Sequence, residues 1–416
     1  MQTALADFIR DTPEGREADS ILRACVHCGF CTATCPTYQL LGDELDGPRG
    51  RIYLMKQVLE GAEVTVTTQL HLDRCLTCRS CETTCPSGVK YGRLLDIGRR
   101  VVEQKVGRTS AERATRWALR RALLSKSLFG GAVAVGRVVR GLMPAALRAK
   151  LPDALPAGHW PAPRHARQMI VLEGCVQPAL APNIDGATAR VLDRVGISLL
   201  RVPAAGCCGA LPYHMEADDE AHALVKRNID AWWPHVQRGI EAIVVTASGC
   251  GVMVKDYGYV LRHDARYAQK AAKIAAIARD PVEVIGAEWP RIAPKIAMDH
   301  GPQKVAFHPP CTLQHGMRLA ASVEEILLAL GLETTPVPDR HLCCGSAGTY
   351  SILQPELAER LKVNKLAALE QGRPEVIATA NIGCMAHLAS GTRIPVRHWI
   401  ELLDARMVDE RPPLAR

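Results

Sequence analysis

The sequence predicts an α+β protein in which an α-helical N-terminal domain is followed by a duplicated α/β domain with parallel sheets. Three observations lead to this fold class. The chain contains 16 cysteines, and they form two sets of eight that differ in spacing. The first set flanks an amphipathic helical stretch near the N-terminus, whereas the second set recurs twice on alternating apolar runs and helical stretches. The two sets therefore predict two kinds of domain.

Length and composition indicate a globular protein with several domains. The 416 residues predict about three domains, and 48% hydrophobic with 23% charged residues excludes disordered, collagenous and coiled-coil classes. The first twenty residues carry acids and no apolar core, so we expect no secretory signal. No apolar run is long enough to predict a spanning helix. We expect a cytoplasmic protein, with a peripheral position on the cytoplasmic face of the inner membrane as the alternative, and thiolates rather than disulfides.

The first cysteine set has the spacing C-x2-C-x2-C-x3-C-P twice, at 25–36 and at 75–86. Two-cluster ferredoxins have this spacing, and in them the fourth cysteine of each motif binds the other cluster. The expected metal ligands are Cys25, Cys28, Cys31 and Cys85 for cluster 1, and Cys75, Cys78, Cys81 and Cys35 for cluster 2. We therefore expect residues 1–105 to form a ferredoxin-like domain with two 4Fe-4S clusters as cofactors.

Zinc is the alternative metal for a site with four thiolate ligands. Structural zinc usually takes two separated pairs of ligands, so the doubled motif favours iron–sulfur clusters. Between the motifs, the segment 46–61 predicts a turn followed by an amphipathic helix. We expect Arg49 and Arg51 of this segment to be solvated or to meet acidic groups of a partner.

The segment that follows, 106–167, predicts a basic helical linker. Between Arg99 and Arg167 there are fifteen Lys or Arg and three acids, and basic residues interleave with Leu, Val and Ala at helical spacing over 116–151. Such helices can lie on an anionic membrane surface, and the simpler alternative is packing on the first domain or on an acidic partner. We expect no nucleic acid partner, because no binding module accompanies the charge.

After the linker, apolar runs rich in β-branched residues alternate with helical stretches. The expected strands are 168–172, 197–202, 243–247, 304–307 and 375–380, and the expected helices include 183–195, 218–236, 322–330 and 356–370. This alternation predicts parallel sheets with crossover helices. We expect two modules, at 168–300 and 301–416.

The second cysteine set occurs once in each module, just after the expected strands. The candidate residues are Cys175, Cys207, Cys208 and Cys250 in the first module, and Cys311, Cys343, Cys344 and Cys384 in the second. The lone cysteine precedes the Cys-Cys-Gly pair by 32 residues in both copies, which indicates a duplication. Ligands collect at the carboxyl ends of parallel strands, so we expect these thiols to converge within each module or between the two. They form a third cluster or a redox site, or else they are buried structural cysteines.

Several segments resemble a known family. They include ACVHCGFCTATCPTYQLLGDELDGPRGR, HLDRCLTCRSCETTCPSGV, HLCCGSAGTY and VRHWIE. These are similar to iron–sulfur subunits with a ferredoxin-like domain and Cys-Cys-Gly modules, a family that includes subunits of heterodisulfide reductase, anaerobic glycerol-3-phosphate dehydrogenase and the lactate-utilisation proteins. The likeness is greatest to the iron–sulfur subunits of bacterial glycolate oxidase, also called glycolate dehydrogenase.

The resemblance implies an electron-transfer subunit of an oxidoreductase complex, with no catalytic residues for substrate oxidation on this chain. Partner subunits that carry FAD would oxidise glycolate to glyoxylate, and this subunit would pass the electrons toward a quinone-type acceptor. The sequence has no dinucleotide-binding fingerprint, which agrees with a flavin on another chain. The alternatives are a subunit of a lactate, 2-hydroxy acid or glycerol-3-phosphate dehydrogenase, and a docking scaffold that tethers the flavin subunits to the membrane.

One departure from the family concerns the Cys-Cys-Gly modules. In the heterodisulfide reductase relatives each module typically ends in C-x2-C, whereas Met253 and His387 stand at the last position here. The missing thiolates argue against non-cubane clusters and disulfide reduction, although a module that itself reduces quinone or disulfide stays an alternative. A third cubane shared by the modules, or one module occupied, also stays open. His387 is a candidate ligand, and His308 and His341 could donate to a cluster sulfur or a quinone, or simply pack.

Overall fold

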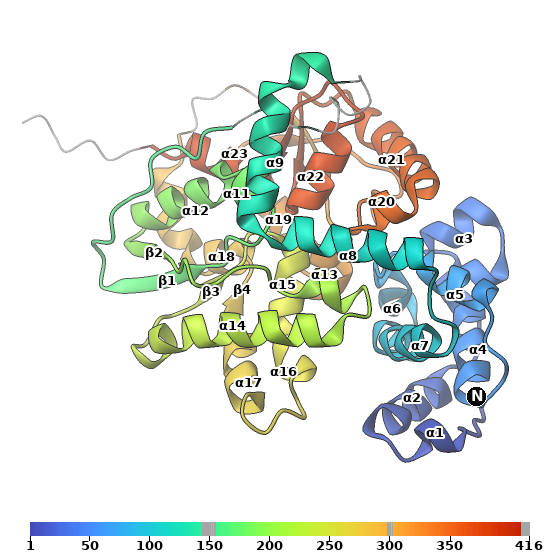
Figure 1. Ribbon diagram of the computed structural model, residues 1–416. Coiled ribbons are helices and arrows are strands. Elements are labelled where there is room, and N and C mark those ends of the chain that lie inside the picture. Colours follow the sequence, from blue (N-terminus) through green and yellow to red (C-terminus); the bar gives the residue numbers. More distant parts are fainter. Residues whose placement is uncertain (144–150, 152, 154, 298–300, 302, 409–416) are drawn as a thin grey trace, which may run out of the picture.

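The computed structural model describes residues 1–143, 151, 153, 155–297, 301 and 303–408. The chain has a helical N-terminal region and two α/β modules, which Figure 1 shows in blue, in green to yellow, and in orange to red. Within the described residues there are two four-stranded parallel sheets, one with its strands between Arg167 and Arg279, in module 1, and one with its strands between Lys304 and His398, in module 2. The predicted fold class is confirmed.

The N-terminal region consists of short helices around an apolar core that includes Leu22, Met55 and Leu94. Its helices are α1 (Asp7–Arg10), α2 (Pro13–Ala24), α3 (Pro36–Leu41), α4 (Pro48–Leu59), α5 (Val66–Asp73), α6 (Ser80–Thr84) and α7 (Tyr91–Val106), with 3-10 turns at Phe30–Thr32 and Glu44–Asp46. Several helices begin with proline, whose missing N–H is no loss in the first turn. Helix α7 packs closely on α4 because Gly98 has no Cβ, which would lie 2.5 Å from Met55 Sδ.

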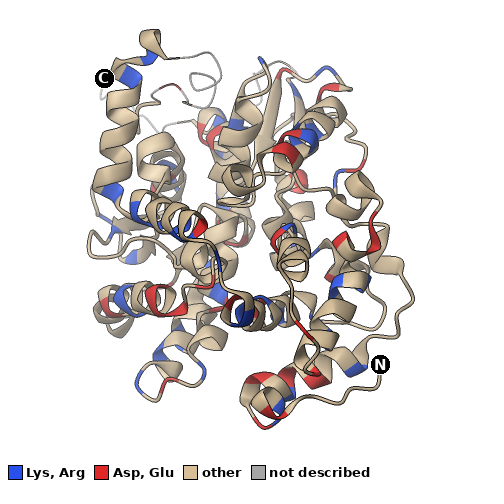
Figure 2. Cartoon of the chain, turned by 45° about the vertical axis from the view of Figure 1, so that its right-hand side comes forward, with Lys and Arg blue, Asp and Glu red and all other residues tan. Residues whose placement is uncertain are grey.

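The basic linker forms two helices, α8 (Ser110–Leu124) and α9 (Lys126–Val138), with a 3-10 turn at Arg140–Leu142. Helix α8 runs from the N-terminal region across module 1 (Figure 1). There Arg116 Nη2 lies 2.5 Å from Glu216 Oε2, and Arg120 Nε lies 2.7 Å from Glu220 Oε2. Figure 2 shows all Lys and Arg residues of the described chain in blue and all Asp and Glu residues in red. The described part of the linker therefore packs on acidic groups of module 1, while 144–150 of the expected basic segment lie outside the described residues.

Module 1 contains a parallel sheet in the order β2-β1-β3-β4. Its strands are β1 (Arg167–Val171), β2 (Ile197–Arg201), β3 (Ile243–Val244) and β4 (Ala278–Arg279), and Met169 pairs with Leu199. The helices are α11 (Gln177–Leu180), α12 (Asn183–Arg194), α13 (Ala210–Tyr213), α14 (Asp218–Gln237), α15 (Ser248–Lys255), α16 (Tyr257–Val260), α17 (Ala268–Ile277) and α18 (Pro281–Ile292), followed by a 3-10 turn at Ala293–Lys295.

Module 2 repeats this sheet in the order β6-β5-β7-β8. Its strands are β5 (Lys304–His308), β6 (Glu333–Thr334), β7 (Val376–Thr379) and β8 (Val396–His398). The helices are α19 (Ala320–Ala329), α20 (Tyr350–Leu353), α21 (Pro355–Glu370), α22 (Ile382–Ala389) and α23 (Trp399–Arg406), and Thr312–Met317 form a π-helix. The equivalent strand order supports the duplication. The expected strands did not include β4, β6 or β8, whose two or three residues are too few to show a pattern.

The two modules share one apolar core. Val171 of β1, Val305 of β5 and Trp399 of α23 belong to the same buried cluster. Polar contacts add to it, since Arg190 of α12 donates to Asp404 of α23 at 2.9 and 2.6 Å. Because the modules are packed through both apolar and ionic contacts, the positions of their cysteines are fixed relative to each other. No helix of the described residues has the length and apolarity to cross a membrane.

Candidate iron–sulfur and thiol sites

Each cysteine motif of the N-terminal region forms a loop with unusual backbone angles on both sides of its middle cysteine. His27 and Gly29 flank Cys28 with φ of +56° and +84°. Thr77 and Arg79 occupy the same places in the second loop with φ of +53° and +59°. Left-handed geometry at a residue other than glycine costs free energy and persists where the surroundings require it. Here it lets three successive thiols turn toward one point.

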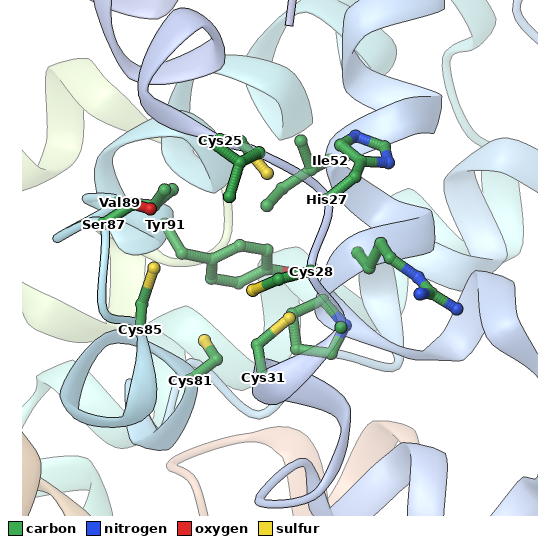
Figure 3. Close-up of a pocket in the computed structure, with 14 residues that line it drawn as sticks. Cys25, His27, Cys28, Cys31, Ile52, Cys81, Cys85, Ser87, Val89 and Tyr91 are labelled. Carbon is green, nitrogen blue, oxygen red and sulfur yellow. The ribbon is translucent and has the colours of Figure 1, made fainter.

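The first cysteine site combines three thiols of one motif with the last thiol of the other. Its four cysteines are Cys25, Cys28, Cys31 and Cys85, and they line one pocket together with Ile52 and Tyr91 (Figure 3). The chain's N-terminal amine donates to the carbonyl oxygen of Cys25 at 2.8 Å. Cys28 is exposed, so this site lies close to the surface.

The second cysteine site has the reciprocal composition. Its four cysteines are Cys35, Cys75, Cys78 and Cys81, and they line a pocket that also contains Arg51 and Tyr91. The Tyr91 hydroxyl donates to Cys75 Sγ at 3.6 Å. Since Tyr91 and Cys81 line both pockets, the two sites are direct neighbours. The first pocket thus holds Cys25, Cys28, Cys31 and Cys85 together with Cys81, and the second holds Cys35, Cys75, Cys78 and Cys81. Which of these thiols bind which cluster stays a prediction.

The chemistry of these donors fits 4Fe-4S clusters. Burial raises the pKa of the Cys31 thiol to about 11, and it raises the pKa values of Cys78 and Cys81 far above the usual range. Thiolates at such positions need a cationic partner to be stable. Four soft thiolates per site are the ligands that iron–sulfur clusters prefer. A short loop whose thiols point inward can bind several iron atoms of one cluster.

Two guanidinium groups are buried beside the second cysteine site. Arg51 Nε donates to the carbonyl oxygen of His71 at 2.7 Å, and its Nη1 donates to Thr37 Oγ1 at 3.1 Å. Arg99 Nη2 donates to the carbonyl oxygen of Cys75 at 2.8 Å. The expectation that Arg51 is solvated or meets a partner is wrong, because it packs inside the N-terminal region against an internal acid, Asp46.

The thiols of module 1 converge within that module. Cys175 lies beside Cys207, Cys207 beside Cys208, and Cys208 beside Cys250. Asn228 fixes the loop of the pair, since its Nδ2 donates to the carbonyl oxygen of Cys207 at 2.8 Å. These thiols occur after β1, after β2 and in α15, at the carboxyl edge of the sheet where the sequence predicted them.

The thiols of module 2 converge in the same way and also face the N-terminal region. Cys311, Cys343, Cys344 and Cys384 form a chain of neighbouring thiols. Cys343 and Cys311 belong to an apolar cluster that also contains Cys78 of the second cysteine site. Each set thus gathers within its own module, and the set of module 2 continues toward the second cysteine site.

The three candidate histidines of module 2 differ in position. His308 is buried beside Cys344 and Cys384. His341 is half-buried near Cys343 in sequence, and its carbonyl oxygen accepts from His315 Nε2 at 3.1 Å. His387 Nε2 lies 3.4 Å from the carbonyl oxygen of Ala358, so its ring faces α21.

Comparisons with known proteins decide the family. Residues 21–89 match the 4Fe-4S dicluster domain, and 169–255 and 305–389 match the cysteine-rich domain. The chain is 57% identical over 411 residues to the glycolate oxidase iron-sulfur subunit of Escherichia coli strain K12, which covers 99% of this chain and 100% of that protein. The chain belongs to the family of glycolate oxidase iron–sulfur subunits.

More distant members and relatives of the glycolate oxidase iron–sulfur subunits are also similar. The probable glycolate oxidase iron-sulfur subunit of Bacillus subtilis strain 168 is 30% identical over 397 residues, or 88% of each chain. Lactate utilization protein A of Bacillus velezensis is 28% identical over 245 residues, which is 56% of this chain and 97% of that protein. Residues 21–89 of this family member are a 4Fe-4S dicluster domain, as the family match shows.

Sequence reasoning missed residues of this family member that connect its parts. His315 Nδ1 lies 2.9 Å from Thr83 Oγ1, which joins module 2 to helix α6 of the second motif. Tyr350 of α20 donates to the carbonyl oxygen of Arg74 at 3.2 Å. Neither residue has a local sequence pattern, because each contact joins segments that are far apart in the chain. Only the duplicated spacing of the cysteines indicated that the regions work together.

Proposed function

We propose that this chain is the electron-transfer subunit of a flavin-dependent glycolate-oxidising complex. FAD on partner subunits oxidises glycolate to glyoxylate, and this subunit passes the electrons toward a quinone-type acceptor. The observation that carries the proposal is the pair of neighbouring cysteine-lined pockets that share Tyr91 and Cys81, in a chain so similar to the Escherichia coli subunit. When bound, two 4Fe-4S clusters supply one-electron transfer.

The proposed ligands are those of the crossed arrangement. Cys25, Cys28, Cys31 and Cys85 hold cluster 1, and Cys75, Cys78, Cys81 and Cys35 hold cluster 2. Short donors help to stabilise the thiolates, since Thr37 Oγ1 lies 3.3 Å from Cys35 Sγ and the Tyr91 hydroxyl reaches Cys75 Sγ. The buried Arg51 and Arg99 stabilise negative charge at the second site, so an added electron is held more strongly there than at the first.

The surface around the first cysteine site is a suitable contact for the flavin subunit. Cys28 is exposed, and next to it Val26 and Phe30 are 67% and 61% exposed. Apolar side chains of this kind at a rim with an accessible redox site favour docking of a protein donor. We place the FAD-bearing partner on this surface, with the acceptor on the other side of the second site.

The acceptor side has a second candidate function. Cys311 and Cys343 of module 2 lie in one apolar cluster with Cys78, so this module could receive electrons and reduce quinone or a disulfide itself. The similarity to lactate utilization protein A likewise keeps lactate as a substrate of the partner subunits. We propose a cytoplasmic location, with a peripheral contact with the inner membrane where the quinone is reached.

Substitution of a ligand in the assembled complex tests the relay. In Cys28→Ser and Cys78→Ser complexes, glycolate should still reduce the flavin while reduction of the acceptor is lost. The wild-type chain, prepared without oxygen, should hold about eight iron atoms for two clusters, and the variants fewer. A further cluster in the Cys-Cys-Gly modules would raise the count toward about twelve. Loss of flavin reduction in a fully assembled variant complex contradicts the relay, and unchanged acceptor reduction contradicts the ligand assignment.

A further inference from the structure

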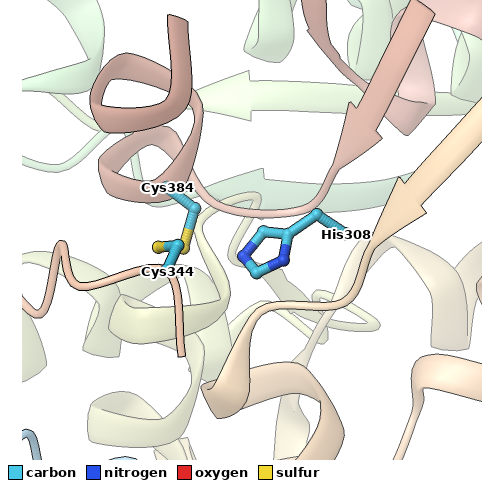
Figure 4. A group of neighbouring side chains, drawn as sticks. All are labelled: His308, Cys344 and Cys384. Carbon is cyan, nitrogen blue, oxygen red and sulfur yellow. The ribbon is translucent and has the colours of Figure 1, made fainter. Parts of the chain in front are cut away.

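We propose that His308, Cys344 and Cys384 bind a single divalent transition-metal ion, with zinc as the best fit, at a site separate from the two clusters. One nitrogen of His308 and the two Sγ atoms all lie within 4.8 Å of one another. Figure 4 shows the imidazole ring facing the two sulfur atoms. This inference does not depend on the electron-transfer role.

The three side chains come from three elements that meet at the carboxyl edge of the sheet of module 2. His308 is the last residue of β5, Cys344 lies in the Cys-Cys-Gly loop after β6, and Cys384 lies in the first turn of α22. All three are buried, so water does not compete for the donors. The site would thus tie a strand, a loop and a helix together.

A second, independent observation that supports a bound metal ion is the environment of the His308 side chain. Its side chain is 1% exposed, and within the described part of the chain neither ring nitrogen has a hydrogen-bond partner. A buried polar group without a partner destabilises the folded state, and native structures rarely contain one. A metal ion bound to one nitrogen removes most of that cost.

The separation of the donors points to one ion rather than a cluster. In tetrahedral zinc sites with Zn–S near 2.3 Å, neighbouring donors lie about 3.8 Å apart, which a group within 4.8 Å can reach with small shifts. The cysteines of the two cluster sites form no group this compact among the described residues. Two thiolates and one imidazole are soft and borderline donors that suit zinc. Cys343, beside Cys344, is a further donor for the fourth position.

A second compact group carries no such inference. It consists of Asp43, Asp46 and His71. Both carboxylate oxygens of Asp46 already accept from arginines, Oδ1 from Arg51 at 3.2 Å and Oδ2 from Arg74 at 2.9 Å. Those cations neutralise the acid, so a metal ion would add positive charge to a site that is already balanced.

Module 1 provides an internal control. Cys208 and Cys250 correspond to Cys344 and Cys384, but Leu172 stands three residues before Cys175 where His308 stands three before Cys311. Leu172 is 3% exposed and packs in an apolar cluster with Cys208. Module 1 therefore lacks the nitrogen ligand, and we assign the ion to module 2 alone.

The zinc and iron contents of the full-length chain, purified without oxygen and without chelators, test this site. We expect about one zinc ion per wild-type chain. His308→Leu should lower zinc by more than about tenfold at unchanged iron, while His308→Cys should retain zinc because a thiolate replaces the imidazole. Cys384→Ser should lose zinc, and the matched Cys250→Ser variant of module 1 should keep it.

Three outcomes would overturn the site. They are wild-type protein without zinc even after zinc is supplied, zinc that survives His308→Leu, and zinc that Cys250→Ser removes. Iron that falls together with zinc in His308→Leu would instead assign these residues to an iron cluster. Two measurements distinguish loss of the zinc site from failure to fold: the EPR signals of the N-terminal clusters and thermal unfolding. Both should be the same in His308→Cys as in the wild type.

Discussion

Arg51 and Asp46 form an ion pair, 3.2 Å between Nη2 and Oδ1, in which each side chain is only 1% exposed. The pair lies next to the second cysteine site, whose pocket Arg51 helps to line. Hydrogen bonds to Thr37 and His71 satisfy the rest of the guanidinium. The arginine charge is therefore held rigidly beside the thiolates, and water cannot screen it.

This arrangement predicts that Arg51 raises the reduction potential of the cluster held by the second site. In Arg51→Lys the charge stays but the forked hydrogen bonds are lost, and in Arg51→Met the charge is lost as well. We expect the potential to fall by tens of millivolts in Arg51→Met and by less in Arg51→Lys, since positive charge near a cluster stabilises its reduced state. A redox titration followed by EPR measures both.

Arg10 supplies the control for this prediction. It is exposed, pairs with Asp7 and lines neither cluster pocket. Arg10→Met should leave both potentials unchanged. Equal potentials in wild type and Arg51→Met, with iron content intact, would show that the buried charge does not influence the cluster.

A buried acid predicts how stability depends on pH. Burial raises the pKa of Asp185 to about 7, although Thr246 Oγ1 and Gln177 Nε2 donate to it. Because the folded state holds a proton that the unfolded state releases, this group makes stability fall by about 1.4 kcal/mol per pH unit between the unfolded pKa and about 7. Asp185→Asn should flatten the decline in the free energy of unfolding from pH 5 to 7. Urea unfolding at several pH values measures it, and an unchanged slope rejects the assignment.

The Cys-Cys-Gly loop of module 2 depends on its glycine. Gly345 has φ of +89°, and a Cβ there would lie 2.5 Å from the carbonyl oxygen of Ala358. We expect Gly345→Ala to destabilise the protein by about 2 kcal/mol or more, through strain and the clash together. In α18, Gly286 has open space around it, so Gly286→Ala should instead stabilise by about 0.5–1 kcal/mol. Thermal unfolding of both variants compares them, and similar effects would contradict the argument.

Helix α8 of the linker forms two ion pairs with module 1 that differ in the burial of their acids. Glu216 is 7% exposed and Glu220 is 30% exposed in their pairs with Arg116 and Arg120. Loss of the cation leaves a buried carboxylate in one case and a solvated one in the other. Arg116→Ala should cost about 2 kcal/mol and Arg120→Ala about 0.5 kcal/mol in urea unfolding. Proteolysis of α8 should accelerate in the first variant only, and the reverse order would show that burial does not set the strength of these pairs.

The sequence predicted the parts of the molecule that leave a repeated pattern. Cysteine spacing gave the N-terminal region and the duplicated modules, and the fold class was confirmed; which cysteines hold which cluster stays a prediction. The burial of Arg51 was not predictable from the sequence. An arginine on an amphipathic helix is normally expected to be solvated, and only the structure shows that Asp46 pairs with it in the interior. The sequence could not distinguish His308 from a packed histidine. Its neighbours Cys344 and Cys384 are distant in the chain, and they come close to His308 only when strands β5, β6 and β7 pair into one sheet.

The apolar cluster that Cys78 shares with Cys311 and Cys343 of module 2 has a consequence for evolution. A tandem duplication starts with two equal halves under the same selection. The N-terminal region docks on both halves, since Arg79 of the second cysteine pocket pairs with Asp256 of module 1. Among the described residues, however, only the thiols of module 2 share an apolar cluster with Cys78, and this ends the equality. Substitutions in the other half, such as leucine at position 172, then escape the constraint. We expect a mutational scan to find module 1 more tolerant around its thiols than module 2.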